Sequence, residues 1–75
     1  MTLSEFHEHV SDTFFGEMIS HQTLTRMEYY ANVKASELFP EVANVKINLR
    51  GTSDIDMSFY FKSEQDYVWF KLKYQ

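Results

Sequence analysis

The side chains that could do chemistry in this 75-residue chain are few, and their spacing does not suit a metal site. His7 and His9 lie two residues apart, so on a helix they would point in different directions. Glu5, His9 and Asp12 would share one helical face, but the chain has no Cys and offers no fourth ligand. His21 lies near a predicted turn, where a polar surface or cap role is expected rather than catalysis. We therefore expect no metal and no cofactor.

Sequence signatures of catalysis are equally scarce. The chain contains no G-x-S-x-G turn for a nucleophilic serine, no phosphate-binding glycine loop and no cysteine. A substrate-sized pocket would also take up much of the core of so small a domain. The expectation is a protein that is not an enzyme.

Basic and aromatic residues in the last third of the chain have the composition of a binding surface. They are Lys46, Arg50, Lys62, Lys71 and Lys73, together with Tyr60, Tyr67 and Trp69. Aromatic rings among Lys and Arg on a sheet are how several single-strand binders stack bases and hold phosphates. Trp, Tyr and Arg are also common anchors of protein interfaces. A third interpretation is a solvated face whose lysines discourage aggregation. The net charge of −4 favours a protein partner, because phosphate contacts supply much of nucleic-acid affinity.

Acidic residues gather in the first half, where seven acids face two bases over residues 1–41. Those expected on the polar side of the first helix are Glu5, Glu8, Asp12 and Glu17. They could mimic a phosphate backbone and occupy the nucleic-acid groove of another protein. An ordinary solvated helix face is the simpler interpretation, since charges usually line the outer side of an amphipathic helix.

Two capping boxes predict two helices in a single domain that spans residues 1–75. Thr2 and Glu5 have the spacing of a capping box, and Thr25 and Glu28 repeat it. Apolar residues then recur every three or four positions after each start. The predicted helices cover approximately residues 3–19 and 25–39, and the second should end before Pro40.

Strict alternation of apolar and polar residues predicts three strands, at approximately residues 44–50, 54–62 and 67–74. One register satisfies both hairpins: Val45 faces Phe59 in the first, and Phe59 faces Phe70 in the second. That register buries Ile47, Met57, Phe59 and Phe70, and it sets Tyr60 opposite Trp69 on the open face. The predicted fold is α+β, with two N-terminal helices packed on one face of a three-stranded antiparallel meander (ααβββ).

The function predicted from these patterns is a small acidic, non-enzymatic protein-binding module. The analogy is with small phage or mobile-element proteins that inhibit or regulate a larger protein or nucleoprotein complex. A single-strand nucleic-acid-binding domain and a nucleic-acid mimic are the alternatives. A homodimer is also open, because both outer strands of the meander are unpaired edges. No apolar run approaches the ~20 residues that cross a membrane, and the N-terminus lacks a signal-peptide pattern, so the expected location is the cytoplasm, or the host cytoplasm if a virus encodes the chain.

Overall fold

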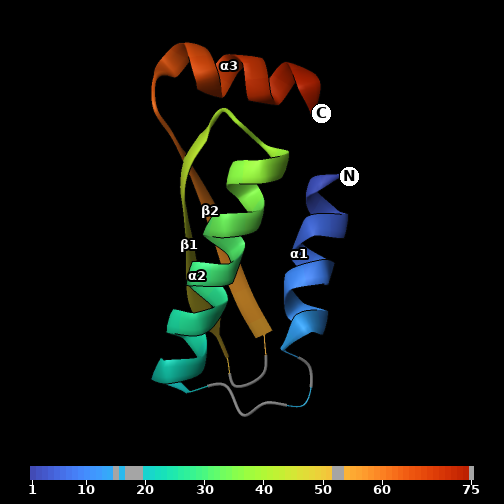
Figure 1. Cartoon of the computed structure of the whole chain (residues 1–75), viewed down its shortest axis with the longest axis vertical. Coiled ribbons are helices and arrows are strands. Elements are labelled where there is room, and N and C mark those ends of the chain that lie inside the picture. The colour runs from blue at the N-terminus through green and yellow to red at the C-terminus, as the bar shows by residue number, and fades with distance from the viewer. Residues whose placement is uncertain (15, 17–19, 52–53, 75) are drawn as a thin grey trace.

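The computed structural model describes residues 1–14, 16, 20–51 and 54–74, and within them it contains three helices and a two-stranded antiparallel sheet (Figure 1). The elements follow the order α1 (Leu3–Thr13), α2 (His21–Leu38), β1 (Val42–Arg50), β2 (Asp54–Phe61) and α3 (Glu64–Lys73). None of these helices is long and apolar enough to pass through a membrane.

The predicted α+β class with an antiparallel sheet is confirmed, but the three-stranded ααβββ order is wrong. Residues 67–74, the predicted third strand, lie in α3 and its C-cap. The Ser63 hydroxyl caps this helix by accepting the Asp66 N–H at 3.2 Å. Acids in the first turn and lysines in the last turn also complement the helix dipole. The second predicted hairpin, with Phe59 facing Phe70 across strands, therefore does not form.

The helix starts agree with the sequence in one case and not in the other. In α1 the predicted capping box is confirmed, since the Thr2 hydroxyl accepts the Glu5 N–H and Glu5 accepts the Thr2 N–H. Helix α2 begins four residues earlier than predicted, because Ser20 caps it and Thr25 lies inside the first turns. The predicted extension of the first helix to residue 19 is wrong, since α1 ends at Thr13; residues 15 and 17–19 lie outside the described residues.

The register predicted for the first hairpin is confirmed. Leu49 pairs with Ile55, and Val45 pairs with Phe59. Strand β1 begins at Val42, two residues before the predicted start, and an irregularity follows between Val42 and Asn44. Apolar residues therefore line one face of the sheet, which is buried at Val45, Ile47 and Ile55 and exposed at its far end at Leu49. The charged residues of both strands lie exposed on the other face.

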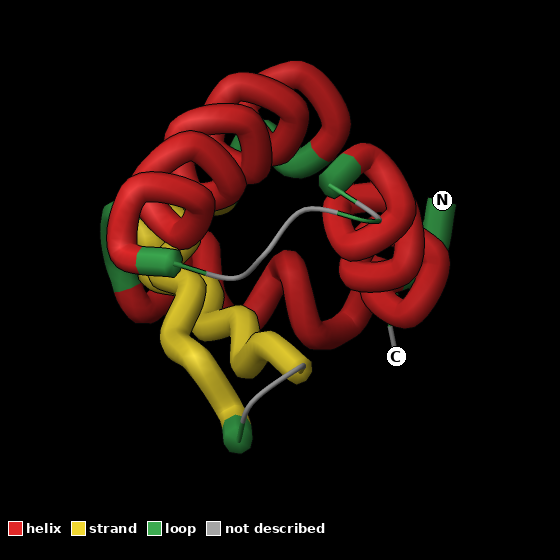
Figure 2. The backbone as a smooth tube through the Cα atoms, turned by 90° about the horizontal axis from the view of Figure 1, so that it is seen from below, coloured by secondary structure: helices red, strands yellow, loops and turns green. Residues whose placement is uncertain are grey.

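Helix α2 lies along the outer edge of β1 and satisfies main-chain groups that a third strand would otherwise pair. The Asn32 amide accepts the Val45 N–H at 2.8 Å and donates to the Val45 carbonyl at 2.9 Å. A Glu28 carboxylate oxygen accepts the Ile47 N–H at 3.2 Å. Seen from below, α2 lies directly against the hairpin (Figure 2). Pairing of a second copy along this edge would require α2 to leave it.

The core joins all three helices and the sheet. Its buried apolar residues are Phe6, Val10, Met27, Ala31, Ala35, Phe39, Val42, Val45, Ile47, Ile55 and Phe70. Phe39 is central, with its ring edge-on to those of Phe6 at 5.2 Å and Phe70 at 5.6 Å. Of the predicted core residues, Ile47 and Phe70 are buried, and Met57 and Phe59 are partly buried against the cluster. Phe70 reaches the core from a helix rather than from a strand.

Candidate functional site

Helix α3 crosses one end of the molecule, over the start of β1 and the end of β2 (Figure 1). Its inner side is held by aromatic contacts: Phe70 lies 4.9 Å from Phe61 and 4.9 Å from Tyr74, measured between ring centroids. Tyr74 also meets Phe39 edge-on at 5.0 Å. Because residues 70 and 74 are one helical turn apart, they anchor a single side of α3 and leave the opposite side in water.

That opposite side is apolar and exposed. Val68 is 49% exposed, Trp69 58% and Leu72 66%. Residues 68, 69 and 72 share one helical face because residue 72 lies four positions after residue 68 and three after residue 69. We call these three residues the outer face of α3. A cluster of large apolar side chains left in water on so small a domain is typical of an interaction surface.

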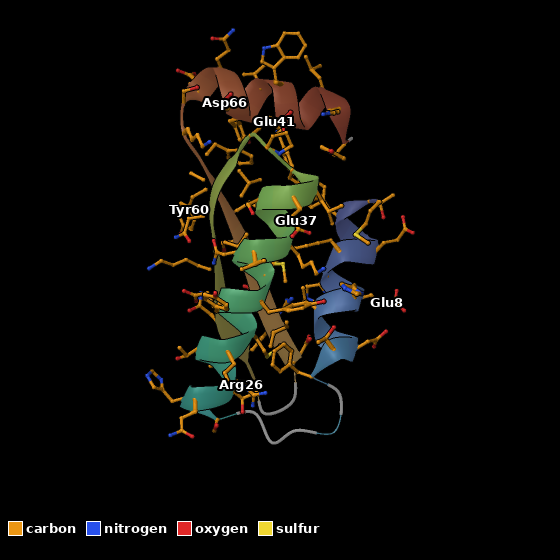
Figure 3. All side chains as sticks on the ribbon, viewed as in Figure 1. Glu8, Arg26, Glu37, Glu41, Tyr60 and Asp66 are labelled. Atoms are coloured by element: carbon orange, nitrogen blue, oxygen red, sulfur yellow. The ribbon has the colours of Figure 1, made fainter. Side chains whose placement is uncertain are left out.

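A groove of about 420 Å³ runs beside the outer face, between α3 and the residue that precedes β1. Trp69, Leu72, Lys73 and Glu41 line it. Figure 3 shows Glu41 beneath α3, at the edge where β1 begins. The groove therefore joins an exposed apolar helix face to a carboxylate from another part of the chain.

The Glu41 carboxylate is only partly satisfied. One oxygen, Oε1, accepts from Lys73 Nζ at 3.4 Å, a long contact to a side chain that is 55% exposed. The other, Oε2, is buried and has no hydrogen-bond partner among the described residues. The whole side chain is 16% exposed. An unsatisfied buried acceptor costs about 1–3 kcal/mol, so a donor that reached Oε2 would recover part of that free energy.

The structure divides the predicted binding surface into two parts. Tyr67, Trp69, Lys71 and Lys73 lie on α3, whereas Lys46, Arg50, Tyr60 and Lys62 lie on or beside the sheet. The predicted contact of Tyr60 opposite Trp69 is wrong, because Trp69 is not in a strand. Tyr67 instead packs its ring against Phe61 at 5.3 Å, and Lys71 Nζ lies over the Tyr67 ring at 5.3 Å.

The open face of the sheet is mixed in charge. Arg50 pairs in register with Asp54, and Lys46 with Ser58. Tyr60 is 51% exposed beside them, as its position in Figure 3 illustrates. A face with acids next to its bases and one exposed ring in the sheet is a weaker candidate than the outer face of α3.

The acidic residues of the first helix have local explanations. Glu5 serves the capping box, and the Thr2 backbone N–H, followed by the Thr2 side chain, lowers the pKa of its carboxyl below the usual 4.5. Glu8 and Asp12 are exposed, and Glu17 lies outside the described residues. His9 Nε2 lies 2.8 Å from the Tyr30 hydroxyl. Within the described part of the chain, no three His, Cys, Asp or Glu residues are grouped closely enough to hold a metal ion.

Three residues of the site escaped the sequence analysis. Val68 and Leu72 occupy alternate positions with Trp69, Lys71 and Lys73, and a strand would have turned both inward. The helix turns them outward. Glu41 was not singled out because nothing local links it to α3. The available signal was the Ser63-x-x-Asp66 spacing, which is that of a helix start.

Comparison of the chain with protein-family models, with curated proteins and with solved structures finds no significant match. The case for a function therefore depends on the chain's own residues.

Proposed function

We propose that this chain is a small, non-enzymatic protein-binding module whose contact surface is the outer face of α3 with the adjoining groove. The observation that carries the proposal is the exposure of Trp69 and Leu72, at 58% and 66%, on a helix whose other side is fastened to the core. Covering a large apolar side chain is worth about 1.5–3 kcal/mol. A protein surface that buries both residues would recover that free energy.

The rigidity of α3 also supports binding. Its N-terminus is capped by Ser63, and its inner ring contacts extend to Phe39 and Phe61. A preformed helix face loses little conformational entropy when a partner covers it. By occupying a surface of a larger protein, such a module would act as an inhibitor or regulator, which is the role we propose.

The charges near α3 favour a protein over a nucleic acid as the partner. Lys73 is paired with Glu41, and Lys71 lies over the Tyr67 ring. Glu64 and Asp66 add negative charge in the first turn of the same helix. With a net charge of −4, the chain would gain little from phosphate contacts.

Affinity capture from the native host, read by mass spectrometry with and without nuclease, tests the proposal. The bait carrying Trp69→Ala and Leu72→Ser should lose a partner that the unmodified bait retains in the presence of nuclease. Tyr29→Ala is the matched control, because Tyr29 is a large ring that is 74% exposed on α2. Circular dichroism should show that every bait is folded. Release of the partner by nuclease, or its equal capture by the doubly substituted bait, would refute the proposal.

A further inference from the structure

The groove beside α3 has a chemical requirement as well as a shape. Glu41 Oε2 is buried without a hydrogen-bond donor among the described residues, and Oε1 holds only the long contact to Lys73. Trp69 and Leu72 supply apolar walls next to this carboxylate. An occupant that fits must bring donors to the carboxylate and apolar surface to the walls.

An arginine side chain meets both requirements. Its guanidinium carries five N–H donors in a planar fork that matches the two oxygens of a carboxylate. Its plane stacks on aromatic faces, and indole is the best of them for a cation. Its methylene stem can cover apolar surface while its head stays polar, and Leu72 offers such surface. A lysine ammonium is a compact point charge that cannot match both oxygens at once.

Lys73 is the competitor for the same carboxylate. Its ammonium lies 3.4 Å from Oε1, and its side chain is 55% exposed, so it can swing into water at little cost. An incoming guanidinium can therefore replace this weak contact with a charge-assisted hydrogen bond to Oε1, and a rotation of the carboxylate that uncovers the buried Oε2 would allow a second. An anionic occupant would instead need Lys73 and would face the Glu41 carboxylate as a like charge.

We propose that this groove binds an arginine side chain presented by the protein partner, with the guanidinium on Glu41 and the stem between Trp69 and Leu72. The inference depends on the proposed protein-binding function, which it makes more specific by naming the chemistry of the contact.

The first experiment uses a small probe, N-acetyl-arginine amide, titrated into the folded chain. Trp69 is the chain's only tryptophan, so its indole N–H resonance reports directly on the groove. The resonance should move saturably, with a dissociation constant in the millimolar range, roughly that of a single side-chain contact. N-acetyl-citrulline amide has the same shape without the charge and should move it at least about tenfold less, because the charge-assisted bonds are lost. Equal shifts with both probes would overturn the inference.

Two substitutions in the groove should act in opposite directions. Glu41→Gln keeps the side-chain shape and should weaken binding of the arginine probe at least about tenfold, because only one neutral acceptor remains. Lys73→Met keeps most of the methylene chain of Lys73 and removes the competing ammonium. This variant should bind the arginine probe several-fold more tightly. Glu37→Gln is the control, since Glu37 makes a similar ion pair with Lys34 in a more exposed position on α2. Weaker binding of the arginine probe to Lys73→Met would show that Lys73 supports the groove instead of competing for Glu41, and it would overturn the inference.

Capture of the partner with substituted baits distinguishes the arginine contact from the protein-binding function on which it depends. Loss of the partner by Glu41→Gln, with retention by Glu37→Gln, supports the arginine contact. If the Glu41→Gln bait retains the partner and the bait with Trp69→Ala and Leu72→Ser loses it, the arginine contact is overturned and the protein-binding function stands. Retention by both baits overturns both proposals.

Discussion

The side-chain amide of Asn32 on α2 binds both main-chain polar groups of Val45 on β1, accepting its N–H at 2.8 Å and donating to its carbonyl at 2.9 Å. An amide is well suited to this task because it presents one acceptor and two donors in a plane, as a neighbouring peptide group does. Glu28 extends the arrangement one turn away by accepting the Ile47 N–H. Helix α2 thus occupies the place of a third strand along this edge of the sheet.

Replacing Asn32 with alanine should destabilise the fold. The substitution leaves the Val45 N–H and carbonyl without partners in a partly buried site, and each such group costs about 1–3 kcal/mol. Urea unfolding followed by circular dichroism measures the loss. Asn48→Ala, at an exposed position of the same strand, should change the free energy of unfolding by less than about 0.5 kcal/mol. Equal losses for the two variants would contradict the role assigned to Asn32.

The same substitution should loosen α2 from the β1 edge and so make that edge available to other chains. Unpaired main-chain groups on a strand edge are templates for intermolecular pairing. Asn32→Ala should therefore form dimers or larger species at concentrations at which the unmodified chain does not, and analytical ultracentrifugation would detect them. Unchanged sedimentation of a folded Asn32→Ala variant would show that the edge stays covered without the amide.

Phe70 and Trp69 are neighbours with opposite roles in α3. Phe70 is 4% exposed in the aromatic core, so Phe70→Ala should cost about 3–5 kcal/mol. Trp69 is 58% exposed, so Trp69→Ala should alter stability by less than about 0.5 kcal/mol. Thermal unfolding measures both. If Phe70→Ala fails to fold, Phe70→Leu supplies the comparison. A loss for Trp69→Ala as large as that at Phe70 would mean that residues 64–73 are not in this helix.

The cap of α3 offers a separate test of the helix. Ser63→Ala removes the acceptor of the Asp66 N–H and should lower the free energy of unfolding by about 0.5–2 kcal/mol. Ser36→Ala is the control: Ser36 is exposed near the end of α2, where its hydroxyl donates to the Val33 carbonyl. Alanine there should be neutral or slightly stabilising because it is the better helix former. Equal responses at the two sites would argue against the cap.

The capping box of α1 should make the start of that helix sensitive to acid. The Thr2 backbone N–H, and then the Thr2 side chain, hold the pKa of the Glu5 carboxyl below 4.5 in the folded state. Because this pKa is lowered on folding, the ionised Glu5 carboxylate stabilises the fold fully above pH 4.5. That stabilisation is lost as the pH falls through the pKa of the folded state. The Thr2 amide resonance should follow this titration. Glu5→Gln should abolish the pH dependence of that resonance, and Glu8→Gln should preserve it.

Local signals sufficed for the hairpin. Alternation along residues 45–49 and 55–59 admits one register with every apolar residue inward, because a slip by one position would turn each side chain to the opposite face. The observed pairs Leu49–Ile55 and Val45–Phe59 follow from that constraint. The start of α1 was equally local, since Thr2 and Glu5 satisfy each other within one turn.

The spacing of apolar residues could not by itself assign residues 64–73. Phe70 and Tyr74 are separated by four positions, and this spacing places them on one face of a strand and also on one face of a helix. The choice depends on which neighbours are available. The Phe39 and Phe61 rings receive one helical side of α3, and α2 already occupies the edge of β1. Sequence spacing carries no record of either contact.

By itself, then, the sequence determined the α+β class, the register of one hairpin and the cap of α1, because each depends on residues that are close along the chain. Only the tertiary structure decided that Trp69 and Leu72 point into water and that Glu41 lies beside them. Glu41 and Lys73 are 32 positions apart and meet only when α3 folds over the start of β1. The candidate site exists because α3 folds over the start of β1. The free energy that holds α3 there comes from the aromatic core beneath the helix and not from the contact between Glu41 and Lys73.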